Sequence, residues 1–196
     1  MSIYIKGFKP VAFLLMLGAV LFISCDEESV PRKRGYLRIE IPESGYQPFN
    51  PESCPFSFEI SKLAVAVPDT NSLAEPCWWY IMYPTLNAQI FLSYKAINNN
   101  FNTYAEDART LVYKHTQRAN SINEEMITNA NHASGILYSI GGDAASSVQF
   151  FMSDSTDHFL RGALYFNAVP NSDSLAPVIT YIKNDMSRML ATMKWK

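Results

Sequence analysis

The residues best suited to chemistry lie together in one short stretch at the end of a predicted strand. Asp154, Asp157 and His158 gather there beside Ser153 and Ser155. A carboxylate can orient a histidine that acts as a general base, and the histidine can then activate a serine hydroxyl. Carboxylates and imidazoles are also metal ligands. This stretch is therefore a candidate site for an envelope hydrolase or for a carbohydrate-binding protein.

A purely structural role competes with that interpretation, and the residue pattern favours it. Carboxylates in turns commonly accept hydrogen bonds from their own backbone, and a metal site needs three or four ligands that converge in space. The sequence has no Gly-x-Ser-x-Gly elbow, and Gly141-Gly142 lacks the residues that complete a phosphate-binding loop. We therefore expect a turn at Asp154–His158, no metal, no cofactor and no enzymatic activity.

A run of aromatic residues forms a second candidate surface. In a strand, Trp78 and Tyr80 would point to one face and Trp79 to the other. Trp and Tyr are frequent in binding hot spots because they bury a large area and keep a polar tip. Core packing is the favoured interpretation of this run, and an exposed binding patch is the alternative.

The amino terminus indicates the compartment. Lys6 and Lys9 precede a short apolar run, and Ser24-Cys25 follows it in a pattern that resembles the bacterial lipobox. The run is shorter than the roughly 20 apolar residues of a spanning helix. We expect residues 1–24 to be a signal peptide and Cys25 to carry acyl chains such as palmitate. The alternative is an uncleaved anchor helix with a buried, unmodified Cys25.

Export bears on the two remaining cysteines, Cys54 and Cys77. Disulfides persist outside the cytoplasm, so an even pair is most simply one bridge. In the chain-entropy treatment, a loop of this size would contribute roughly 3 kcal/mol. Two buried thiols are the alternative. A metal site is not expected, since neither cysteine has a Cys or His at ligand spacing.

Bulk properties narrow the class of protein further. Loss of residues 1–24 would change the net charge from −2 to −4, because it removes Lys6 and Lys9 but no acid. That balance argues against a nucleic-acid-binding protein. We expect a tether at 25–35 and a single domain at 36–196. The tether begins with the acidic run Asp26-Glu27-Glu28, which resembles a surface-export signal. An outer-membrane anchor facing the periplasm is the first expectation, and display on the cell surface is the alternative.

Periodicity predicts an α+β domain. Alternating apolar residues predict strands, and spacing of three to four residues predicts two helices. The predicted strands are 56–60, 78–83, 88–94, 121–128 (a weaker prediction), 135–140, 147–153 and 159–169. One helix follows Asn102 or Thr103, and the other begins at Ser172 or Asp173 with Pro177 in its first turn. Short turns between the last three strands predict an antiparallel meander, so the expected fold is a mostly antiparallel sheet flanked by helices.

Several stretches resemble one family closely. They are RGYLRIEIP from Arg34, CPFSFEI from Cys54, EPCWW from Glu75, LSYK from Leu92, the block from Gly141 to Ile179, and the closing MKWK. These stretches resemble the gliding motility lipoprotein GldD family of the Bacteroidetes. The resemblance implies a lipoprotein needed for surface gliding and linked to type IX secretion. It implies partners among the envelope proteins of those systems, with the bilayer reached through Cys25, and it assigns no catalytic residue.

A weaker likeness concerns the fold alone. The order of elements, with a late meander and a terminal helix that ends in an aromatic residue, is similar to the Mog1/PsbP-like sandwich. Proteins of that fold include binding and assembly factors, but a shared fold fixes no function. Three functions therefore remain as hypotheses: a non-catalytic assembly or scaffold lipoprotein, an envelope hydrolase or carbohydrate binder that uses the Asp154–His158 turn, and a structural lipoprotein without a specific partner.

Overall fold

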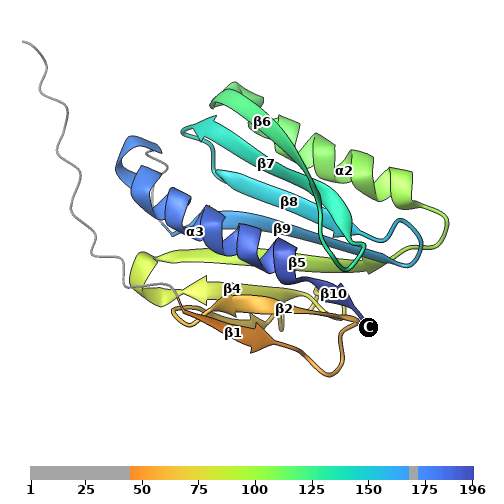
Figure 1. Ribbon diagram of the computed structural model, residues 1–196. Helices are drawn as coiled ribbons and strands as arrows, with labels where there is room; N and C mark the ends of the chain where they lie inside the picture. The colour runs from red at the N-terminus through yellow and green to blue at the C-terminus, as the bar shows by residue number, and fades with distance from the viewer. Residues whose placement is uncertain (1–44, 168–171) are drawn as a thin grey trace, which may run out of the picture. The chain divides into compact units, whose positions relative to one another are not determined.

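The computed structural model describes residues 45–167 and 172–196. The expected signal peptide, the lipidated Cys25 and the tether lie outside the described residues. The described part contains two antiparallel sheets and two α-helices (Figure 1). An α+β domain with a mostly antiparallel sheet, as the sequence predicts, is confirmed.

The larger sheet has seven strands, and each neighbouring pair is antiparallel. In spatial order the strands are β3 (Val65–Pro68), β4 (Trp79–Tyr83), β5 (Ala88–Ala96), β9 (His158–Phe166), β8 (Val148–Ser153), β7 (Ser134–Gly142) and β6 (Ala119–Thr128). Strands β7 to β9 form the predicted three-strand meander, and β6 extends it by a fourth strand. The weakly predicted strand at 121–128 is confirmed as β6, an edge strand.

The smaller sheet has three strands. Its spatial order is β1 (Tyr46–Phe49), β2 (Phe56–Ser61) and β10 (Lys194–Trp195). The central strand therefore pairs with both ends of the described chain. Pro48 sits in the edge strand β1, where a missing N–H breaks no ladder inside a sheet.

The two helices lie on opposite faces of the larger sheet (Figure 1). They are α2 (Phe101–Tyr113) and α3 (Ser172–Thr192), accompanied by the short 3₁₀ turns η1 (Pro84–Leu86) and η2 (Lys114–Gln117). We call the face under α3 and the smaller sheet the inner face, and the face that carries α2 the outer face. Alternation along each strand sends successive side chains to these two faces.

The main core fills the inner face. Side chains of the larger sheet meet the predicted methionine-rich stripe of α3 and the aromatic residues of β2 there. Fully buried members include Ile81, Ile90, Leu160, Ile182, Met186, Met189, Leu190 and Phe56. A second cluster joins α2 to the outer face through Ala108, Val112, Tyr138, Ile140, Phe151 and Phe159. Burial of these two apolar surfaces accounts for the packing of both helices.

Several boundaries differ from the sequence predictions. Helix α2 begins at Phe101 with Asn100 at its N-cap, so Asn102 and Thr103 lie inside the helix and do not cap it. Helix α3 begins at Ser172, so Pro177 lies in its second turn rather than its first. The carbonyl that loses its partner is that of Asp173, which is exposed, so water can replace the missing bond. Strand β4 begins at Trp79, which leaves Trp78 just outside it. Cys77, with φ of 65°, turns the chain at that point.

The predicted disulfide is present. It joins Cys54 and Cys77, whose Cα atoms lie 5.5 Å apart, within the ordinary range for a bridge. Cys54 precedes β2 in the smaller sheet, and Cys77 precedes β4 in the larger sheet. The bridge therefore links the two sheets, close to the aromatic run at Trp78.

Candidate functional site

The stretch after β8 forms the predicted turn. Asp154 Oδ1 accepts backbone N–H bonds from Thr156 at 3.1 Å, from Asp157 at 2.9 Å and from His158 at 2.9 Å. The Ser155 N–H donates to Ser153 Oγ at 2.8 Å, and Ser155 has a φ of 69°. These local bonds hold the turn and place His158 at the start of β9.

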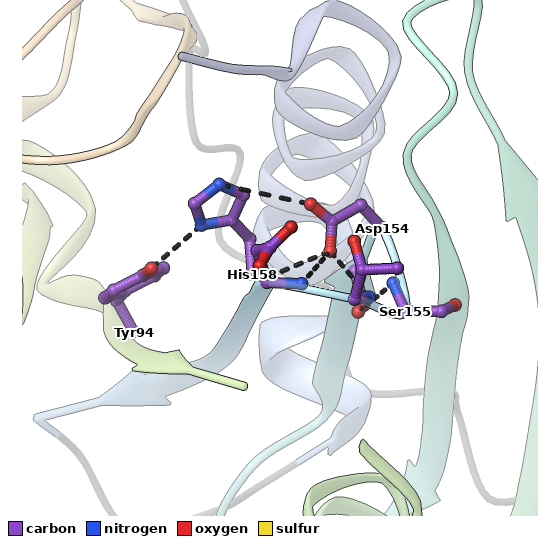
Figure 2. Close-up of polar contacts among 7 residues, drawn as sticks. Tyr94, Asp154, Ser155 and His158 are labelled. Carbon is purple, nitrogen blue, oxygen red and sulfur yellow. Dashed lines mark hydrogen bonds and ion pairs between the residues drawn. The ribbon is translucent and has the colours of Figure 1, made fainter. Parts of the chain in front are cut away.

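The His158 ring is held on three sides, two of which are shown in Figure 2. Its Nδ1 lies 2.8 Å from the Tyr94 hydroxyl, and its Nε2 lies 4.0 Å from Asp154 Oδ2. The indole of Trp195 stacks on the imidazole, with ring centroids 5.1 Å apart and planes 22° apart. Four residues from β5, the turn, β9 and β10 therefore meet in one group, which we call the histidine clamp: Tyr94, Asp154, His158 and Trp195.

Electrostatics fix the protonation states of the groups around the imidazole. Burial pushes the pKa of Asp154 upward, but the three backbone N–H bonds and the nearby His158 outweigh it and lower that pKa below the ordinary value. Burial, followed by the charges of Asp154 and Asp157, raises the pKa of Tyr94. Tyr94 is therefore a neutral phenol, whose hydroxyl can either donate to Nδ1 or accept from it.

The two candidate serines do not meet the imidazole. Ser153 of β8 pairs with Phe159 of β9 and points to the outer face, whereas His158 immediately precedes Phe159 in β9 and points to the inner face. Ser153 is also buried, at 2% exposure. Asp157 is exposed, and its carbonyl accepts the Ile97 N–H at 2.8 Å. The turn thus brings Asp154 to His158 but presents neither serine to it.

The aromatic run divides between the two faces as the sequence predicts. Trp79 points inward and packs edge-on against Phe49, with centroids 5.1 Å apart. Trp78 and Tyr80 both contact Phe91 of β5, at centroid distances of 5.5 Å and 5.2 Å. The Trp78 indole N–H donates to the Tyr94 carbonyl at 3.2 Å. Tyr94 therefore connects the aromatic run to the histidine clamp.

An apolar surface continues from Tyr80 across the outer side of β3, β4 and β5. Facing pairs in the register are Val65 with Met82, Val67 with Tyr80, and Tyr80 with Phe91. Val65 is 54% exposed and Val67 is 38% exposed. Helix α2 packs on β8 and β9, away from these strands. We call these five residues, Val65, Val67, Tyr80, Met82 and Phe91, the open face.

Charged residues border the open face. Lys95 forms an ion pair with Glu75 and lies over the Trp78 ring, 5.5 Å from its centroid. Asp69 Oδ2 accepts a hydrogen bond from the Tyr80 hydroxyl at 3.4 Å. An apolar centre with a polar rim is the usual composition of a protein-binding surface.

Sequence reasoning missed several of these residues as members of a site. Tyr94 lies 64 positions before His158, and only strand pairing brings them together. Val65 and Val67 belong to a strand of four residues, too short for a clear alternation. The one available signal was Trp195, an isolated aromatic residue beyond the terminal helix.

Two properties of the described residues bear on the class of protein. Among them, no group of three or more His, Cys, Asp or Glu side chains is placed to hold a metal ion. Neither helix of residues 45–167 and 172–196 is long and apolar enough to cross a membrane.

The fold and site define an α+β domain with a histidine clamp and an uncovered apolar sheet face. The sequence matches the gliding motility lipoprotein GldD family over residues 26–195, nearly the whole chain. The chain belongs to that family, as its stretches of resemblance indicated. It is thus a member of a family of lipoproteins with a role in gliding motility.

Comparison with other known proteins adds little. No curated protein matches the chain. Among solved structures, cyanobacterial PsbP (CyanoP) from Synechocystis sp. PCC 6803 is similar at a TM-score of 0.47 and 8% identity, over 80% of this chain and 96% of that one. A TM-score of that size carries no argument about function.

Proposed function

We propose that this protein is a non-catalytic assembly component of the gliding apparatus and its associated type IX secretion system. In this proposal its open face binds another envelope protein. Membership of a gliding motility lipoprotein family supports the setting. The observation that carries the binding role is the open face, because Val65 and Val67 are exposed there beside the half-buried side chains of Tyr80 and Met82 on the next strand.

The geometry of the histidine clamp supports the non-catalytic part of the proposal. A general base needs a nucleophile or a water site within reach, and both imidazole nitrogens here face protein groups. One oxygen of Asp154 already accepts three backbone bonds. The clamp is therefore suited to joining the β8–β9 turn, the end of β5 and the carboxy-terminal strand β10.

The position of the protein in the envelope completes the proposal. Acyl chains on Cys25 would attach it to a bilayer, since two or more chains hold a protein almost permanently. We place the anchor in the outer membrane with the domain facing the periplasm, and display on the cell surface is the alternative. Protease treatment of intact cells separates the two, because only a surface-displayed domain would be digested.

The binding role is tested by placing a charge on the open face. Val67→Lys should abolish gliding and the co-purification of envelope partners after gentle solubilisation, because an ammonium would enter an apolar interface. Val67 is already 38% exposed, so the free energy of unfolding should change by no more than about 0.5 kcal/mol. Leu73→Lys is the matched control, because Leu73 is 84% exposed on a loop outside the open face. Normal gliding with Val67→Lys would contradict the proposal.

The hydrolase alternative is tested at the turn. The double variant Asp157→Ala, His158→Ala should be less stable, because it removes the His158 contacts of the clamp. It should show no loss of hydrolytic activity, since the proposal assigns the natural protein no such activity. Purified protein is assayed for hydrolysis of cell-wall glycan and of peptides, with circular dichroism to confirm folding. Turnover by the natural protein that disappears in a folded double variant would establish an enzyme instead.

A further inference from the structure

The two edges of the larger sheet differ in how well they are protected. Edge strands present unpaired N–H and C=O groups, and proteins usually shorten them or interrupt them with proline or lysine. Strand β3 has four residues and ends in Pro68. Strand β6 has ten residues, Ala119–Thr128, without proline or lysine. In the described ranges, β7 is the one strand that pairs with β6, so its other edge is free (Figure 1).

We propose that β6 is a docking edge for an extended basic segment of another protein, which adds to the sheet as a further strand. Main-chain hydrogen bonds supply the affinity in this mode of recognition, and alternate side chains supply the selectivity. The proposal goes beyond the open face, because β6 lies at the opposite edge of the sheet from β3.

The strand is held ready for such a partner. The Tyr113 hydroxyl of α2 donates to Glu124 Oε1 at 2.9 Å, and Arg109 Nε lies 3.9 Å from the same oxygen. The register with β7 is regular from Ser121 to Thr128, and the bulge lies between Ala119 and Ser121, at the start of the strand. An edge fixed in an extended form loses little conformational entropy on pairing.

The side chains of β6 specify the chemistry of the partner. Glu124 faces Tyr138 on the outer side, and Glu125 faces Leu137 on the inner side. The Glu125 side chain is exposed and forms no hydrogen bond or ion pair with the described residues. Met126 is 89% exposed on the outer side. A matching strand therefore carries a basic residue beside Glu125 and an apolar residue beside Met126, which is an alternation of lysine and an apolar residue.

A second copy of this chain fits the edge less well. In an antiparallel pair of β6 strands whose twofold axis lies at Glu124 or Glu125, that glutamate would face its own counterpart. Like charges directly opposite each other destabilise a strand pair. Charge therefore favours a basic segment of a different protein over self-association.

The test uses the full-length lipoprotein purified in detergent and three synthetic peptides. The first alternates valine and lysine, the second alternates valine and glutamate, and the third is the lysine peptide with alternate backbone nitrogens methylated. The lysine peptide should bind at least about fivefold more tightly than the glutamate peptide. N-methylation should abolish binding, because it removes main-chain donors. Amide hydrogen exchange should slow along β6 and stay unchanged along β3.

Substitutions identify the edge. Glu125→Lys with Met126→Lys should remove peptide binding, whereas Val67→Lys should leave it intact, so failure here is distinguishable from failure of the open face. Equal binding of the methylated peptide, or peptide binding that survives the double substitution, would overturn the proposal. Dimers in sedimentation that dissociate with the same double substitution would overturn it in favour of a second copy.

Discussion

The hydroxyl of Tyr83 donates a 3.2 Å hydrogen bond to Oδ2 of Asp185 inside the core, across 102 positions of sequence. The Tyr46 hydroxyl donates to Oδ1 of the same carboxyl at 3.0 Å. Asp185 is 1% exposed. One carboxyl on α3 therefore joins a strand of each sheet, in addition to the apolar contacts of the helix.

The setting of this carboxyl makes its ionisation costly. Burial raises the pKa of Asp185 above its ordinary value, although hydrogen bonds from Tyr46, Tyr83 and Ser61 oppose the rise. Burial and the neighbouring Asp185 in turn raise the pKa of the Tyr83 phenol, which stays a hydrogen-bond donor. The Asp185 carboxyl therefore stabilises the fold through its hydrogen bonds, but its ionised form is disfavoured in this buried position.

Asp185→Asn should change how stability depends on pH. The unfolded chain releases the Asp185 proton near its ordinary pKa of 3.8, before the folded chain does. This residue therefore lowers the free energy of unfolding as pH rises from that value through the higher folded pKa. Each pH unit between the two pKa values contributes about 1.4 kcal/mol. In urea denaturation, the free energy of unfolding of the asparagine variant relative to that of the natural protein should be higher at about pH 7 than at about pH 4.

Asp185→Ala is the control for this experiment. Alanine removes the acceptor of three hydroxyls, of which those of Tyr83 and Ser61 are buried, so it should lower the free energy of unfolding by about 3 kcal/mol. If the asparagine variant and the natural protein follow parallel curves between the two pH values, the carboxyl has no raised pKa.

A second relationship explains a glycine inside a central strand. Gly162 of β9 faces Phe150 of β8 in the register, and a Cβ at Gly162 would overlap the Phe150 ring. Gly162→Ala should therefore lower the free energy of unfolding by about 2 kcal/mol, since the ring has no free space to enter. Adding Phe150→Leu should recover part of the loss. Gly45→Ala is the control, because its Cβ would meet the flexible side chain of Lys62. Equal losses at both glycines would contradict this explanation.

The sequence predicted the elements whose signal is local. The alternation in β5, β7, β8 and β9 and the apolar stripe of α3 each extend over several residues, so period and face are readable. The short strands β1, β3 and β10 were not predicted, because two to four residues are too few to show a period. Their strand form follows from tertiary pairing with β2 and β4.

The sites were less predictable than the fold for the same physical reason. Asp154 was identified correctly as a turn residue, because an Asx-type turn depends on residues two to four positions away. Tyr94 could not be placed beside His158 without the β5–β9 register. Asp185 lies three residues after Ile182 and four before Met189, so the helical period places it on the apolar stripe, but the local sequence does not show what would satisfy a carboxyl there. It is buried because two distant tyrosines supply its hydrogen bonds.

The disulfide offers the last prediction. Residues 55–76, between Cys54 and Cys77, contain β2 and β3, so the bridge closes a loop that includes one edge of the open face. Replacing both cysteines with serine should lower the free energy of unfolding by about 3 kcal/mol, because the unfolded chain regains that loop freedom. Urea denaturation with and without reductant measures the loss, and the serine variant should show no response to reductant.

The same variant bears on the open face. Strand β3 pairs only with β4 within the described residues, so loosening the loop should raise amide exchange at Val65 and Val67 more than at Ile90 in the sheet interior. Partner binding through the open face should weaken in step, since a strand that frays must be ordered before it binds. Unchanged exchange in β3 alongside a full loss of stability would show that the bridge supports the core and not the open face.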